Sequence, residues 1–177
     1  RTLIATLQSA DSTQHDKVVA CHRLAIIGTK EAVPALAALL TDEKLSHIAR
    51  HALEPMPDPA AAAARRDAVG TVRGNLLVGV INSIGFRRDT AATAALAGLL
   101  AGADESVTAA AAAALGRIGS AEAAQQLQGA LSRVSGAFRI VLADASLTCA
   151  ESLVTGRRRS DAALIYDRLC VPGFPDY

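Results

Sequence analysis

Aromatic residues are almost missing from this chain of 177 residues, which has no Trp, three Phe and two Tyr. Proteins that bind single-stranded nucleic acids stack bases on exposed aromatic rings, so the composition argues against a protein of that kind. No apolar run reaches the roughly 18 uncharged residues that a membrane-spanning helix needs. The first residues also lack the order of positive, apolar and small residues that marks a secretory signal. The sequence therefore predicts a soluble, folded protein without a membrane span.

Cysteine is scarce, and the motifs of common enzymes are missing. Cys21, Cys149 and Cys170 show no C-x-x-C spacing, which excludes a zinc ribbon and a thioredoxin-like site. We expect all three to be buried apolar residues, and only Cys149 and Cys170 to be near enough to pair. The adjacent Cys21 and His22 would point about 100° apart on a helix and so form no nucleophile pair. With no G-x-S-x-G, P-loop or G-x-G-x-x-G in a strand–turn–helix context, we predict no catalytic site and no cofactor.

What the chain does contain is a large apolar fraction with balanced charge. Hydrophobic residues make up 51% of the sequence, charged residues make up 20%, and the formal net charge is +1. This composition is far too apolar for a disordered chain. The abundant alanine favours helices and lets neighbouring helices approach closely. A near-neutral charge argues against a globally basic nucleic-acid-binding protein, although it permits local patches.

A repeated pattern runs along the chain. Residues 104–119 have the periodicity of an apolar-faced helix that ends at Gly119, and a second helix follows to Leu131. Residues 42–53 resemble the first of these helices, and residues 27–40 resemble 118–131. A spacing of about 30 residues with two helices in each unit is typical of an α-solenoid. The residues in register are Ile27, Met56, Ile84 and Ile118.

The same frame predicts the helices one by one. Taken alone, Leu76–Ile81 could form a buried strand, but the repeat favours a helix there. Gly28, Gly85 and Gly119 are expected to end helices, and Asp42 to begin one. Residues 171–177 resemble a turn between helices, from which we expect the array to continue. The predicted helices cover roughly residues 1–10, 14–27, 30–40, 42–54, 60–68, 72–84, 89–100, 104–118, 122–134, 137–154 and 161–170.

The pattern of the helix at 104–119 resembles that of HEAT-repeat proteins, of the short-repeat kind called phycobilisome-lyase HEAT-like repeats. The matching residues are Asp104, Val107, Ala111, Ala112, Ala114, Leu115, Gly116, Ile118 and Gly119. The family has an arginine after the valine, where this chain has Thr108 and, in the upstream copy, Ser46. Over residues 14–155, the resemblance implies an all-α, right-handed α-solenoid of about five antiparallel helix pairs. Residues 1–177 would be a single HEAT-like α-solenoid and a segment of a longer array.

In such a family the second helix of each pair lines the concave side, which commonly receives a protein partner. Counting from the apolar positions of helix 104–119, the exposed stripe passes through Ala109 and Ala113. We therefore predict a non-catalytic scaffold that binds a protein partner of unknown identity through equivalent positions. The predicted stripe comprises His22, His47, Arg50, His51, Asn75, Asn82, Asp144, Thr148 and Glu151.

Three alternatives use other features of the sequence. His22, His47 and His51 could bind a metal, but no carboxylate accompanies them in a fixed place, so we expect no metal. The Arg pairs 65–66 and 87–88 and the triplet 157–159 could bind duplex nucleic acid, although solvated surface arginines are the more ordinary interpretation. The lyase activity suggested by the family's name, attachment of a bilin chromophore, finds no matching position here.

Overall fold

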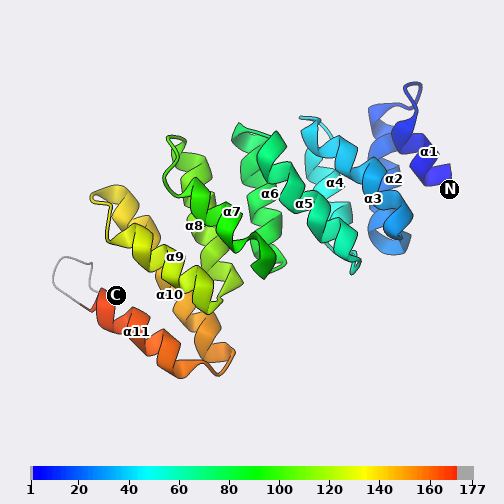
Figure 1. Ribbon diagram of the computed structural model, residues 1–177. Coiled ribbons are helices and arrows are strands. Elements are labelled where there is room, and N and C mark those ends of the chain that lie inside the picture. The colour runs from blue at the N-terminus through cyan, green and yellow to red at the C-terminus, as the bar shows by residue number, and fades with distance from the viewer. Residues whose placement is uncertain (1, 171–177) are drawn as a thin grey trace. The chain divides into compact units, whose positions relative to one another are not determined.

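The computed structural model describes residues 2–170 and shows an all-α protein (Figure 1). Within these residues there are eleven α-helices, three short 3-10 helices and no strand. The expected turn at residues 171–177 lies outside the described residues. The α-helices are α1 (Thr2–Gln8), α2 (Gln14–Ile27), α3 (Val33–Ala38), α4 (Ser46–Leu53), α5 (Pro59–Thr71), α6 (Gly74–Phe86), α7 (Thr93–Leu99), α8 (Glu105–Ile118), α9 (Ala121–Leu131), α10 (Ala137–Thr155) and α11 (Arg159–Leu169). The 3-10 helices are η1 (Lys30–Ala32), η2 (Leu39–Thr41) and η3 (Thr90–Ala92).

Side-chain caps set the starts of several helices. Thr13 and Asp16 form a capping box at the start of α2, in which each side chain accepts the other residue's backbone N–H. The Asp104 carboxylate accepts the backbone N–H groups of Ser106 and Val107 and so begins α8. Gly119 ends α8 with a left-handed backbone, φ 62°, which favours glycine. The predicted start and end of this helix are therefore confirmed.

The chain divides into two compact units, and the boundary falls inside α6. Unit 1 comprises residues 1–83, in which α2 packs against α1 and α4, and α3 packs against α4 and α5. Its core is formed by apolar side chains that recur at helical spacing, as the periodicity predicts. The largest fully buried apolar residues of unit 1 are Leu36, Leu40, Leu53, Val80 and Ile81. The last two confirm the helix, rather than a strand, over Leu76–Ile81.

Unit 2 comprises residues 84–177, and α8 and α10 lie at its centre. These two helices pack against each other, and α7 packs on α8, α9 on both, and α11 on α10 (Figure 1). Five of the nine buried residues of α8 are alanine or glycine, so the helices can approach closely. The largest fully buried side chains of unit 2 are Ile84, Leu96, Leu115, Leu127, Leu142 and Leu153.

Two local expectations were wrong, and one residue of the repeat differs in burial from its register partners. Asp42 does not begin a helix: its side chain accepts the backbone N–H groups of Lys44 and Leu45 in a turn, and α4 starts at Ser46. Gly85 does not end a helix, because α6 continues to Phe86. Ile27 does not share the burial of its register partners Met56 and Ile84, since 68% of it is exposed.

Candidate functional site

The predicted stripe of unit 1 begins on α2 and α4. His22 on α2 and His47 and His51 on α4 are all exposed, whereas the adjacent residues Cys21 and Ala52 are fully buried. The rings of His22 and His51 meet edge to face, with 6.1 Å between their centroids and 68° between their planes. Because α2 and α4 pack directly, the two imidazoles lie closer than the roughly 10 Å that separates packed helix axes.

The histidine pair offers two imidazoles to a ligand, with His47 one helical turn from His51. Within residues 2–170, no group of three or more His, Cys, Asp or Glu side chains is arranged to hold a metal ion. The neighbouring Cys21 thiol does not complete a site, because burial raises its pKa to about 11 and keeps it protonated at neutral pH. The pair is therefore best suited to hydrogen bonding and stacking with a partner.

Arg50 has a structural role within unit 1. Its Nη1 donates hydrogen bonds to the Gly79 carbonyl oxygen at 3.0 Å and to Ser83 Oγ at 3.1 Å, and burial lowers the pKa of the guanidinium. A Cβ at position 79 would lie 2.7 Å from the Arg50 Cζ, so only glycine leaves room for this contact. Arg50 is half-buried and joins α4 to α6, which sets it apart from the exposed histidines beside it.

The remaining predicted residues of unit 1 lie on α6. Asn75 and Asn82 are both exposed, two turns apart. Between them, Val78 is half-buried and Gly79 is covered by Arg50. The two amides can each donate and accept hydrogen bonds, but no other predicted residue lies beside them on the same turn.

In unit 2, the predicted stripe borders a shallow hollow between α8 and α10. The hollow has a volume of about 280 Å³, and Asp144 and Thr148 lie on its α10 side. Ala113 and Arg117 lie on its α8 side, and Val141 and Ala145 complete the lining. Glu151 is exposed on the same helix, one turn past Thr148. The small side chain of Ala113 leaves space between α8 and α10. This alanine has no polar group, but it shapes the surface.

Arg117 is a residue of this surface that the sequence reasoning missed. It is exposed and lies four residues after Ala113, so the same helical register that led to Ala109 and Ala113 would have reached it. The hollow thus brings a guanidinium, a carboxylate and a hydroxyl to one rim over an apolar floor. Such a mixture suits a polar protein surface with one apolar side chain at its centre.

The ordinary interpretation expected every arginine cluster to lie at the surface, but one of them is partly buried. Arg65 is 2% exposed, and its Nη1 donates to the Leu53 carbonyl oxygen at 2.7 Å. It therefore ties α5 to the end of α4, where the last carbonyls of a helix lack partners. The other clusters are exposed: Arg87 and Arg88 follow α6, Arg157 and Arg158 lie between α10 and α11, and Arg159 is the first residue of α11.

The cysteines also differ from expectation in one respect. Cys21 and Cys149 are fully buried, as predicted, but Cys170 is exposed and all three thiols are free. Burial raises the pKa of Cys149 to about 11, and its Sγ donates weakly to the Ser120 carbonyl oxygen at 3.8 Å. Cys149 and Cys170, the two cysteines that we expected to be near enough to pair, are not joined by a disulfide in the described part of the chain.

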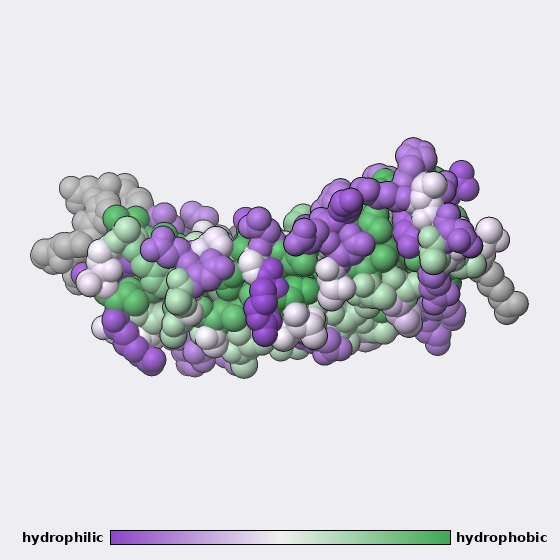
Figure 2. All heavy atoms as spheres, turned by 90° about the horizontal axis from the view of Figure 1, so that it is seen from above, coloured by the Kyte–Doolittle hydropathy of each residue, from purple (hydrophilic) through white to green (hydrophobic). Residues whose placement is uncertain are grey.

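Two broader observations bear on partners. None of the helices between residues 2 and 170 is long and apolar enough to cross a membrane. On the face that Figure 2 shows, hydrophilic side chains are interspersed with apolar ones. No protein-family model matches the sequence, and no curated protein matches it either.

Proposed function

We propose that this protein is a non-catalytic scaffold built of HEAT-like helical hairpins, which binds a protein partner through the exposed side of the second helix in each hairpin. We call that side the second-helix face. In unit 1 it comprises His22, His47, His51, Asn75 and Asn82; in unit 2 it comprises Ala113, Arg117, Asp144, Thr148 and Glu151.

The helix order and the packing within each unit support the repeat. First helices (α1, α3, α5, α7, α9, α11) alternate with the second helices α2, α4, α6, α8 and α10, and neighbouring second helices pack directly in α2 with α4 and in α8 with α10. In the latter pair, Gly116 approaches the Ala145 carbonyl closely. Hairpins of this kind bury their apolar sides only against their neighbours, which is the property of a solenoid.

One observation carries the proposed binding role. Polar side chains that the sequence register places on the second-helix face gather at two spots, the His22–His51 pair and the rim of the α8–α10 hollow. Neither spot has the paired acid and base, the buried nucleophile or the cluster of metal ligands that a catalytic site would use. Exposed polar groups around a small apolar floor are instead typical of a recognition surface.

Site-specific photo-crosslinking would test this role. A photoreactive amino acid at His51 or Asp144 should capture partners from a lysate of the source cell. The same group at Ala95 on α7 or Gln126 on α9, both exposed on first helices, serves as the matched control. Equal capture at all four positions would remove the second-helix face from consideration.

A duplex nucleic acid is the second candidate, because five exposed arginines lie in, or directly after, the turns of unit 2 that follow second helices. They are Arg87, Arg88, Arg157, Arg158 and Arg159. Arg158 is already paired with Asp161 at 2.6 Å, which reduces the charge available to phosphates. Salt-dependent binding of a generic duplex, lost on changing Arg87 and Arg157 to Gln, would favour this function over the scaffold.

A coloured protein or a stoichiometric metal ion after purification would favour the lyase-type or metal-binding alternative.

A further inference from the structure

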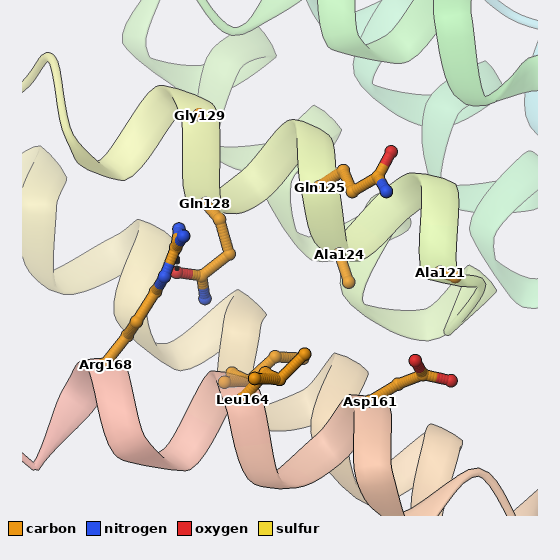
Figure 3. A pocket seen from close by; sticks show the side chains of 9 residues that line it. Ala121, Ala124, Gln125, Gln128, Gly129, Asp161, Leu164 and Arg168 are labelled. Atoms are coloured by element: carbon orange, nitrogen blue, oxygen red, sulfur yellow. Dashed lines mark hydrogen bonds between the residues drawn. The ribbon is translucent and has the colours of Figure 1, made fainter.

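A second concave feature lies on the first helices of unit 2, away from the predicted stripe. It is a pocket of about 370 Å³ between α9 and α11. Figure 3 shows Ala124 and Gln128 of α9 facing Leu164 and Arg168 of α11 across the pocket, with Asp161 at its other end. Its volume falls within the roughly 300–1,000 Å³ of pockets that hold small ligands or single side chains of a peptide.

The middle of the pocket is apolar. Leu164 projects into it from α11 and remains 66% exposed, although Ile165 beside it is buried in the contact with α10 and α9. Ala121 and Ala124 form the opposite wall, and their small side chains leave the space open. An exposed leucine that faces an alanine wall lacks an apolar contact that a side chain of matching size would supply.

One end of the pocket holds a hydrogen-bond donor without an acceptor. An Arg168 nitrogen, Nη1, donates to Gln128 Oε1 at 3.4 Å, which fixes the orientation of the Gln128 amide. The amide nitrogen of Gln128 is then buried from solvent and donates to no acceptor among the described residues. A buried donor in this position favours any ligand that brings an oxygen to it.

The charge at that end is positive. Asp161, at the opposite end, is paired with the guanidinium of Arg158, whereas Arg168 makes its hydrogen bond to a neutral amide alone within residues 2–170. Arg168 lies one helical turn, about 6 Å, beyond Leu164 on the same face of α11. A guanidinium with an amide donor beside it recognises a carboxylate.

From this geometry we infer that the α9–α11 pocket binds the C-terminal residue of a partner chain, with its apolar side chain against Leu164 and its α-carboxylate at Arg168 and Gln128. A terminal residue carries both groups on one Cα, which matches the single turn between Leu164 and Arg168. Within a chain, an acidic residue next to an apolar one in extended conformation would project to the opposite side. The inference is independent of the second-helix face, because α9 and α11 are first helices.

The test uses the whole chain and three peptides, with the Gln128 side-chain amide followed by ¹H–¹⁵N NMR. N-acetyl-glycyl-leucine, which has a free carboxylate, should shift the Gln128 resonances and bind at least about tenfold more tightly than its C-terminal amide. N-acetyl-leucyl-aspartyl-amide, which places the carboxylate on an internal side chain, should bind no better than that amide. Arg168→Gln should weaken the carboxylate peptide by at least about tenfold.

Matched variants separate recognition from folding. Arg159→Gln removes an exposed charge from the same helix outside the pocket and should leave the affinity unchanged. Leu164→Ala, at an exposed position that should not disturb the fold, should weaken the binding of all three peptides equally. His22→Ala should weaken the binding of none of them. Failure of the acid peptide to move the Gln128 resonances, equal binding of its amide, or tighter binding of the internal acid would overturn the inference and leave the second-helix proposal untouched.

Discussion

The two units hold their helices together in different ways. In unit 1, long side chains bridge between helices: Arg50 reaches from α4 to the backbone of α6, and Arg65 reaches from α5 to the last carbonyls of α4. In unit 2, the helices touch directly through small residues, as Gly85 does with Ala114 and Gly116 with Ala145. Helices of this chain are therefore joined either by a charged bridge or by backbone contact.

This difference should determine which substitutions destabilise each unit. A buried guanidinium satisfies helix-end carbonyls, so its loss removes hydrogen bonds as well as volume. A glycine contact includes no side-chain hydrogen bond, but it leaves no space, so any added carbon must separate the helices. Unit 1 should therefore be sensitive to truncation and unit 2 to enlargement.

Truncation of Arg65 should have the largest effect. Arg65→Ala is expected to lower the free energy of unfolding of unit 1 by about 3 kcal/mol, because it leaves a cavity and removes the donor to Leu53. Urea unfolding with pulsed thiol labelling measures each unit separately, since the buried Cys21 reports on unit 1 and the buried Cys149 on unit 2. Cys170 is changed to Ser for this purpose because it is exposed.

The matched control is Arg65→Met, which keeps most of the volume but none of the donors. It should recover part of the loss, and the remaining difference from the native chain measures the hydrogen bonds. A loss of less than about 0.5 kcal/mol for Arg65→Ala would mean that Arg65 does not bridge α4 and α5.

Enlargement of Gly116 should have the next largest effect, this time in unit 2. A Cβ there would lie 2.6 Å from the Ala145 carbonyl oxygen, which belongs to the backbone and cannot turn aside. Gly116→Ala should therefore destabilise unit 2 by about 1–2 kcal/mol, even though alanine favours helices. Accessibility of Cys149 to the thiol reagent gives the value.

Gly98 provides the matched control, because it lies in α7 of the same unit and a Cβ there meets nothing within 4 Å. Gly98→Ala should stabilise unit 2 by about 0.5–1 kcal/mol. If both substitutions raised the stability of unit 2, the close contact between α8 and α10 would be refuted.

A smaller effect is expected for the contact of Arg50 with Ser83. A double-mutant cycle of Arg50→Ala and Ser83→Ala should give a coupling energy of about 1 kcal/mol, because the two side chains share a hydrogen bond of 3.1 Å within unit 1. Labelling of Cys21 supplies the four stabilities. Strict additivity of the two changes would show that the hydrogen bond between Arg50 and Ser83 does not contribute to stability.

The smallest effect is expected in the dependence of each unit's stability on acid pH. Hydrogen bonds from Thr13 lower the pKa of Asp16 in unit 1, and hydrogen bonds from Ser106 and Val107 lower the pKa of Asp104 in unit 2. A lowered pKa in the folded state means stability that is present above about pH 4 and is lost as the pH falls through the folded-state pKa.

Asp16→Asn and Asp104→Asn should therefore reduce this acid dependence, each in its own unit. Urea unfolding from about pH 7 to about pH 2, a range that spans the usual carboxyl pKa values, gives the comparison. Cys21 and Cys149 are labelled in this case with a pyridyl disulfide, which reacts with thiols in acid. A variant whose stability changed with pH as the native chain's does would show that its carboxylate does not contribute.

Much of the helical pattern could be predicted from the sequence, because apolar periodicity and caps are local. Asp104, Gly119 and the helix through Leu76–Ile81 are examples. Arg65 escaped prediction because the neighbouring Arg66 looks the same in the sequence; only the apolar register of Ala61, Ala68 and Val72 could have indicated that position 65 faces the core. The helix of Asp42 was placed too early because an Asp at a turn and an Asp at a helix start use the same hydrogen bonds.

The sequence could predict which residues of the candidate site are exposed, but it could not predict how their side chains are arranged. Helical spacing was enough to select His22, His51, Asp144 and Thr148, all of which are exposed. It could not show that the rings of His22 and His51 touch, because that depends on how closely α2 and α4 pack. Nor could it reveal the pocket at Leu164 and Arg168, which requires the placement of α9 against α11.

The central proposal is that the exposed side of the second helices receives a protein partner. The most direct test measures capture yields for a photoreactive amino acid placed in turn at Asp144, Thr148 and Glu151 on α10, and at Glu122 and Gln126 on α9, which are exposed outside the α9–α11 pocket. The proposal predicts that a given partner is captured from the three α10 positions and not from α9. Capture from α9 alone, or equal capture from both helices, would contradict it.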